Sequence, residues 1–259
     1  QILLQTVVSG LLMGFIFSLI AVGLTLIFGV MDIVNFAHGD YLMLSMYTAF
    51  WLYTLWGVDP LLSLPICVVL LFTIGWLTYK LIINKILRAP MLAQIFSTFG
   101  LMVFLRNAAL LAWSPDYRAI GQSFVSGRLK LFGILIPTPQ LGASVGAVLT
   151  TALIYWFIQR TETGLALQAT AEDAETASLM GINSERMYAL SWGLGAACVG
   201  VAGALLSTWY YIFPEVGYLF GLLAYITVAL GGFGSITGAF IAGIIIGLVE
   251  VLFGFLVAP

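Results

Sequence analysis

The sequence predicts an all-α, polytopic transmembrane helical bundle. Hydrophobic residues make up 62% of the 259 residues, charged residues make up only 8%, and the mean hydropathy is +1.11. Soluble domains carry roughly 25% charged residues, so this chain has too little polar surface to stay dissolved in water. A transmembrane β-barrel would show strands of about ten alternating residues separated by turns. The long, continuous apolar runs of this chain favour helices instead.

Charge-free runs mark the individual spans. A helix needs about 20 largely apolar residues to cross the ~30 Å hydrocarbon layer. No Asp, Glu, Lys or Arg occurs in residues 1–31, 61–79, 131–159, 187–214 and 216–249. Residues 91–113 contain a single charged residue, Arg106. Within the run that begins at residue 131, we expect the span at residues 141–159.

Two helix interruptions complete the count. Residues 216–249 are too long for one crossing, and the glycines of residues 231–235 weaken a helix and permit a tight turn. Residues 41–56 form a shorter span that follows a polar patch at residues 35–40. We therefore expect about eight spans in one transmembrane domain covering residues 1–259. The first span is retained, because its apolar run is longer than the ~7–15-residue core of a secretory signal.

Basic residues predict the orientation of the spans. The basic connection at residues 80–90 favours the cytoplasmic side. The next connection, residues 114–140, carries as many basic residues, and Arg160 and Arg186 decide between the two sides. Residues 161–183, which these two arginines flank, are then cytoplasmic. With eight spans, both termini lie outside.

Residues 161–183 form an acidic island that holds four of the 11 acidic residues of the chain. Between Gly164 and Gly181, residues 165–180 are rich in Leu, Ala, Gln, Glu and Met, which favour helices. A glycine after the last turn suits a left-handed cap. We expect one helix here, with a small mixed face at three-and-four spacing. Two interpretations remain open: a helix that docks into a groove of a partner, and a solvated loop helix.

Three motifs resemble one transporter family. Glu175-Thr176-Ala177 followed by Gly181 is similar to the Glu-Ala-Ala, three residues, Gly signature of binding-protein-dependent ABC importers, with threonine in place of the second residue. The longer run at residues 169–182, ATAEDAETASLMGI, looks like that of the branched-chain amino acid permeases. VNFAHGD and GGFGSITG, which begin at residues 34 and 231, resemble two further motifs of that family. The motifs occur in the family's order across nearly the whole chain.

The resemblance implies a non-catalytic permease subunit in a bacterial-type cytoplasmic (inner) membrane. It implies import of branched-chain or other hydrophobic amino acids together with a second permease, a distinct paralogue, two cytoplasmic ATPases and an external substrate-binding protein. No phosphate-binding loop occurs in this chain, and we expect ATP and magnesium only in the partner subunits, with no cofactor, metal site or nucleic acid here. The alternatives are the same type of permease for urea, short amides or aromatic acids, and a self-contained secondary carrier or channel.

The resemblance also assigns candidate site residues. Residues expected on the ATPase-contacting coupling helix are Leu165, Ala169, Glu172, Asp173, Glu175, Thr176, Ala177, Leu179, Met180 and Gly181. Broken helices at corresponding places in two halves of a transporter point to inverted repeats and to the substrate path. The candidate path residues are Asn35, Phe36, Ala37, His38, Gly39, Asp40, Gly231, Gly232, Gly234, Ser235 and Gly238.

Each path assignment has a structural alternative. His38 is more often a hydrogen-bonded packing residue, and glycines often make plain helix contacts. The predicted topology places both breaks at the cytoplasmic ends of spans, where Asp32 and Asp40 are ordinary helix-end charges.

Two charges and one connection have further interpretations. Arg106 occupies a position that the resemblance fills with an uncharged polar residue; it contacts a substrate carboxylate or extends to the outer headgroups, and its nearness to Ser114 favours the headgroups. Glu250 has no partner that the sequence can name, and a contact with the second permease is one interpretation. Residues 114–139 receive the substrate-binding protein or form an interfacial lid, because aromatic residues favour the membrane surface in either case.

Overall fold

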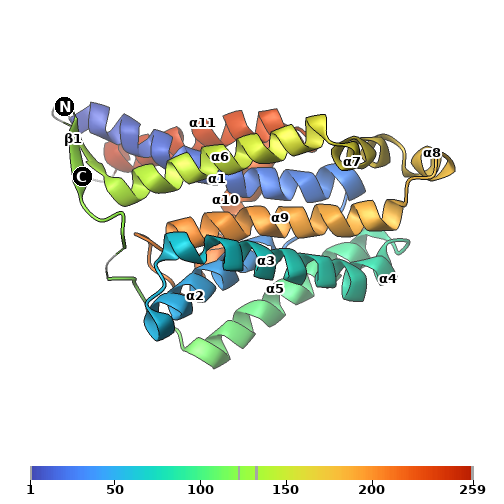
Figure 1. Ribbon diagram of the computed structural model, residues 1–259, viewed down its shortest axis with the longest axis horizontal. Coiled ribbons are helices and arrows are strands. Elements are labelled where there is room, and N and C mark those ends of the chain that lie inside the picture. The colour runs from blue at the N-terminus through green and yellow to red at the C-terminus, as the bar shows by residue number, and fades with distance from the viewer. Residues whose placement is uncertain (1, 122, 132–133, 258–259) are drawn as a thin grey trace.

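The computed structural model describes residues 2–121, 123–131 and 134–257, so Gln1 and Pro259 lie outside the described residues. The elements in chain order are α1 (Ile2–Met31), α2 (His38–Trp56), α3 (Pro60–Thr78), the π-helical turn η1 (Tyr79–Ile83), α4 (Asn84–Ile86), α5 (Met91–Trp113), β1 (Arg128–Leu131), β2 (Ile134–Pro137), α6 (Thr138–Arg160), α7 (Glu162–Glu172), α8 (Ala174–Leu179), α9 (Ser184–Leu206), α10 (Val216–Gly231) and α11 (Ile236–Val257). The predicted all-α bundle is confirmed (Figure 1).

The expected spans are present as helices, but not all of them are long and apolar enough to cross a membrane. Six segments of the described chain meet both conditions: α1, the continuous stretch Pro60–Ile86, α5, α6, α9 and α11. Helix α10 has 16 residues, or about 24 Å, which is shorter than the hydrocarbon layer. Helix α2 carries polar side chains and is largely enclosed by its neighbours. Of the about eight expected spans, six are thus long and apolar enough to cross a membrane, and the other two are present as the helices α2 and α10.

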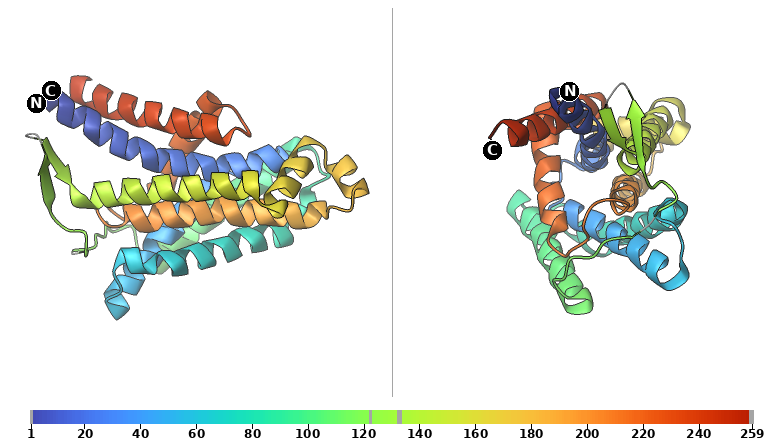
Figure 2. Two further views of the ribbon diagram at one scale, coloured as in Figure 1. Left: turned by 45° about the horizontal axis from the view of Figure 1, so that its top comes forward. Right: turned by 90° about the vertical axis from the view of Figure 1, so that its left-hand side faces the viewer.

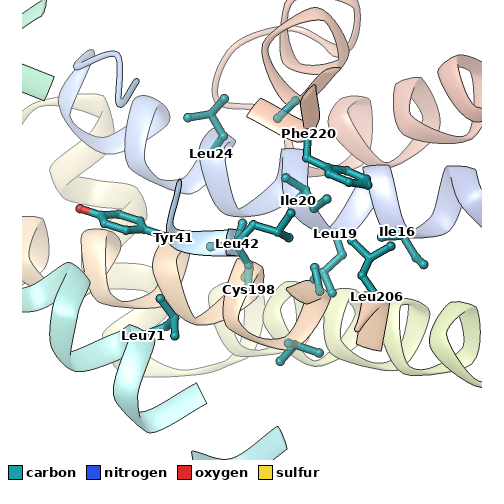
Figure 3. Packing of buried hydrophobic residues seen from close by; sticks show 14 of the residues in the cluster. Ile16, Leu19, Ile20, Leu24, Tyr41, Leu42, Leu71, Cys198, Leu206 and Phe220 are labelled. Atoms are coloured by element: carbon teal, nitrogen blue, oxygen red, sulfur yellow. The ribbon is translucent and has the colours of Figure 1, made fainter. Parts of the chain in front are cut away.

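The core is built on α1 and α9. Helix α1 is buried continuously from Ile16 to Ile27 and packs against α6, α9, α10 and α11. Helix α9 packs against α1, α2 and α3. Figure 3 shows side chains of α1, including Ile16 and Leu19, meeting Leu206 of α9 and Phe220 of α10. Helix α5 is peripheral, since only two of its residues are buried.

The two ends of the bundle differ in content. The termini lie together at one end, and α4, α7 and α8 lie at the other (Figures 1 and 2). The basic connection and the acidic island are thus at the same end, opposite the termini, in agreement with the predicted topology. In the view along the long axis of the bundle, helix α10 lies crosswise to that axis (Figure 2, right). It packs between α2 and α11.

The connection between α5 and α6 contains a β-hairpin that the sequence did not predict. Strands β1 and β2 pair antiparallel, with Arg128 opposite Pro137. The connection is also fixed to neighbouring loops: Arg118 and Ile212 exchange backbone hydrogen bonds of 2.8 and 2.9 Å, and the Phe124 amide donates to Asp59 Oδ2 at 2.6 Å. Four-residue strands are too short for a period-two pattern to stand out in an apolar sequence.

Candidate functional site

The acidic island folds as two helices, α7 and α8, and the prediction of a single helix is wrong. The chain breaks at Asp173, which has φ −157° and caps α8. Its Oδ1 accepts hydrogen bonds from the Glu175 and Thr176 amides at 2.9 and 3.0 Å. A side-chain bond from the Thr176 hydroxyl lowers the pKa of Asp173, so the cap is ionised at neutral pH. Aspartate favours such caps over helix interiors, and the expected continuous mixed face therefore does not form.

Helix α7 is anchored across the end of the bundle. Gly164, Leu167 and Thr170 are buried, and α7 contacts α1, α6 and α9. Gln168 donates from Nε2 to the carbonyl of Ile158 on α6 at 2.7 Å. A displacement of α7 would therefore act directly on these three helices of the bundle.

Helix α8 projects beyond α7 at the end opposite the termini (Figure 1). Of the predicted coupling residues, all except Ala177 are exposed; Ala177 is 4% exposed and packs inward. Leu179 and Met180 are 82% and 80% exposed. Gly181 ends the helix with φ +87°, and the Ile182 amide donates to the Ala177 carbonyl at 3.1 Å, as the predicted left-handed cap requires.

The glycine-rich motif lies beside α7. A hollow of about 770 Å³ is lined by α7, by the end of α6 and by residues 233–237, which form the turn after α10 and the start of α11. The turn lies against the end of α1, because a Cβ on Gly29 would come within 2.8 Å of the Gly234 Cα. Ser235 accepts a hydrogen bond from the Gly238 amide at 3.1 Å and thereby caps α11. This second break is at the end of the bundle that holds α7, as the sequence predicted.

The first break lies deeper. After Met31 the chain folds back, and His38 Nε2 lies 2.9 Å from the carbonyl oxygen of Ile20 in α1. Ile20 lies roughly three helical turns, or about 16 Å, before the end of α1. Asn35, His38 and Asp40 are buried, whereas Asp32 is exposed. The interpretation of Asp40 as an ordinary helix-end charge is therefore wrong, and α2 begins inside the bundle.

The two breaks do not form one site. Gly39 lies against Gly217 in the first turn of α10, whereas the residues from Gly231 to Gly238 lie at the other end of that helix. The His38 ring packs between α1 and α2, and Asn35 accepts a hydrogen bond from the Ala37 amide at 3.2 Å. Among the residues of the first motif, only Phe36 and Asp40 line a pocket between α2, α5 and α10.

Arg106 forms an ion pair inside the bundle. Its Nε lies 3.3 Å from Asp40 Oδ1, and its Nη2 lies 3.4 Å from Asp40 Oδ2. The side chain of Asp40 is 1% exposed and that of Arg106 is 20% exposed. The guanidinium also lies 5.5 Å from the centre of the Tyr218 ring. The prediction that Arg106 extends to the headgroups is wrong, because its charge is paired with a buried carboxylate.

Sequence reasoning missed the remaining wall of this pocket. Met102, Tyr218, Leu222 and Tyr225 line it, but in the sequence they are ordinary members of apolar runs, with no signal that separates them from lipid-facing residues. Glu250 is exposed on α11, and its contact with a second permease stays a prediction.

Comparisons with known proteins agree with the three motifs. A family model described as the permease component of the branched-chain amino acid transport system matches residues 6–259. The chain is 34% identical over 260 residues to the high-affinity branched-chain amino acid transport system permease protein BraD of Pseudomonas aeruginosa, covering 95% of this chain and 85% of that protein.

Two further relatives are permeases named LivH. Identity to the Escherichia coli protein is 32% over 262 residues, with 96% and 85% of the two chains covered. Identity to the probable Methanocaldococcus jannaschii protein is 33% over 248 residues, with 93% and 78% covered. No solved structure matches. The chain is therefore a multi-pass membrane protein that belongs to the branched-chain amino acid ABC transporter permease family.

Proposed function

We propose that this chain is the non-catalytic permease subunit of an ABC importer in a cytoplasmic (inner) membrane. It would form half of the translocation path for branched-chain or other hydrophobic amino acids. Its family and the named substrates of its relatives support this assignment. The other half would come from a second, paralogous permease, and two cytoplasmic ATPases would bind ATP and magnesium. An external binding protein would deliver the substrate.

The observation that carries the proposal is the exposed apolar end of α8. Leu179 and Met180 project from a polar loop at the end opposite the termini. Exposed apolar side chains on the sides of the bundle are explained by contact with lipid, but these two are not. Exposed apolar groups that are rimmed by charge are typical of protein docking sites. Asp173, Glu175 and Gly181, which lie within six residues of this pair in the chain, are exposed as well. A groove on an ATPase is the partner that we assign to it.

The contacts of α7 and α8 supply a path for coupling. The hydroxyl of Ser184, the first residue of α9, donates to the Ala174 carbonyl of α8 at 3.1 Å, and α7 contacts α1, α6 and α9. If ATP-bound ATPases hold α8 in a different position from ATP-free ones, this difference in binding energy shifts the bundle between two states. Inward-open and outward-open forms are the two states required.

ATP-driven uptake tests the proposal. We expect proteoliposomes that contain this permease, its partner permease and both ATPases to accumulate L-leucine, L-isoleucine or L-valine when ATP and the substrate-loaded binding protein are supplied. Uptake of urea, short amides or aromatic acids, with none of these amino acids, would leave the importer assignment standing and overturn the substrate class. Uptake by the permease without ATPases would instead support a secondary carrier.

A further inference from the structure

A small pocket surrounds the Asp40–Arg106 ion pair. It has a volume of about 110 Å³ and lies between α2, α5 and α10. Apart from the two charged side chains, its wall consists of Phe36, Met102, Gly217, Tyr218, Gly221, Leu222 and Tyr225. The pocket therefore places one carboxylate and one guanidinium next to each other within apolar and aromatic surroundings.

The ion pair has long hydrogen bonds, and Arg106 is its more exposed partner. Its two hydrogen bonds measure 3.3 and 3.4 Å, whereas charge-assisted N–H···O bonds are usually about 2.7–2.9 Å long. Asp40 is fixed in the first turn of α2, because the preceding residue, Gly39, lies against α10. Arg106 comes from the peripheral helix α5, which has only Thr98 and Ala109 buried. Arg106 is the more exposed partner, so a rotation of its side chain can separate the pair without a movement of α5, whose Ala109 belongs to the core.

If Asp40 and Arg106 separate, a molecule that enters the pocket must compensate both of their charges. Two uncompensated charges within a membrane protein are costly. An amine can compensate Asp40 but leaves Arg106 unpaired, and a simple carboxylic acid does the reverse. A zwitterionic α-amino acid compensates both, because its ammonium can donate to Asp40 while its carboxylate accepts two bonds from the planar guanidinium.

We propose that Asp40 and Arg106 bind the α-ammonium and α-carboxylate groups of a zwitterionic amino acid during translocation. The substrate opens the ion pair, and its apolar side chain lies against Met102 and Leu222. The pocket of about 110 Å³ is smaller than the ~300 Å³ at the low end of ligand sites, so the substrate must widen it when it opens the ion pair. The proposal rests on the proposed transport function and names the part of the substrate that this chain recognises.

The double variant D40N/R106Q tests the proposal in the complete importer. It removes both charges together, so that no unpaired charge remains buried. Because the charged hydrogen bonds to both ends of the substrate are lost, we expect L-leucine uptake to fall about 100-fold. The complex should still assemble with its ATPases. The charge-conserving variant D40E/R106K should recover part of this uptake. Asn107→Ala, at the next residue of α5, should leave uptake unchanged. Asn107 is exposed, and its side-chain amide donates to the Val103 carbonyl of its own helix.

A binding measurement on the detergent-solubilised complex separates this proposal from the transport function. Millimolar L-leucine should raise the Tm of the wild-type complex, whereas isoamylamine and 4-methylpentanoate, which each lack one of the two charged groups, should not; D40N/R106Q should lose the response. Wild-type uptake by D40N/R106Q, or equal stabilisation by either analogue, would overturn the proposal. A leucine-specific rise in Tm without uptake of any amino acid would support the binding site and contradict the transport function.

Discussion

Replacing Leu179 and Met180 together by glutamate releases the ATPase subunits from the purified importer. Both side chains are at least four-fifths exposed at the tip of α8, and neither supports the bundle. Apolar anchors at the centre of an interface contribute about 2 kcal/mol or more each, and burying a carboxylate in their place is costly. We expect the affinity for the ATPases to fall about 1,000-fold, with loss of ATP-driven uptake. Co-purification and uptake are the measurements.

A matched control is available at the opposite end of the bundle. Phe124 is also a large, exposed apolar residue outside the long helices, so Phe124→Glu likewise replaces an exposed apolar side chain by a carboxylate away from α8. This variant should retain the ATPases. Full retention of the ATPases by L179E/M180E would show that the tip of α8 is not the docking surface.

We expect Gly39→Ala to destabilise the folded bundle strongly. An added Cβ would overlap the backbone of Gly217 in α10 and would lie 2.9 Å from the Gly221 Cα. Both obstacles are backbone atoms, so no side-chain rotation relieves the clash. Overpacking of this kind costs about 3 kcal/mol, which corresponds to a decrease in Tm of roughly 10 °C. Thermal unfolding of the detergent-solubilised protein measures it.

Gly100→Ala provides the comparison for this prediction. Gly100 also lies within a helix, α5, but nothing lies within 4 Å of its added Cβ. Alanine is the better helix former by about 1 kcal/mol, so this variant should be as stable as the wild type or slightly more stable. If Gly39→Ala and Gly100→Ala unfold at the same temperature, the close approach of α2 and α10 is not present in the protein.

The sequence alone predicted most of the helices and their order, because membrane crossing imposes a simple requirement on length and charge. Charge-poor runs located α1, α3, α5 and α6 to within about three residues, whereas the run that contains α9 extends eight residues beyond its end. The glycine-rich segment located the turn between α10 and α11. These features depend on local composition. Composition does not set the residue at which a helix begins. The sequence therefore did not show which helices are long enough to span the membrane.

The features that the sequence did not predict depend on contacts between distant residues, or on a single side chain that caps a helix against the preference of its neighbours. Asp173 interrupts the island because its carboxylate caps the following amides, although the surrounding residues all favour a helix. Arg106 pairs with Asp40, 66 residues away in the chain, and no pattern in the sequence connects them. The fold-back before His38 requires the Ile20 carbonyl as its partner, which is likewise invisible in a local pattern.

Cross-linking from position 180 tests most directly whether this chain is the permease of an ATP-driven importer. Cys67 and Cys198 are buried, so a photoreactive maleimide labels Met180→Cys selectively on this chain in the complete complex. We predict a cross-link to an ATPase subunit from position 180 and none from Phe124→Cys. An importer that transports normally, yet gives no ATPase cross-link from position 180, would contradict the account.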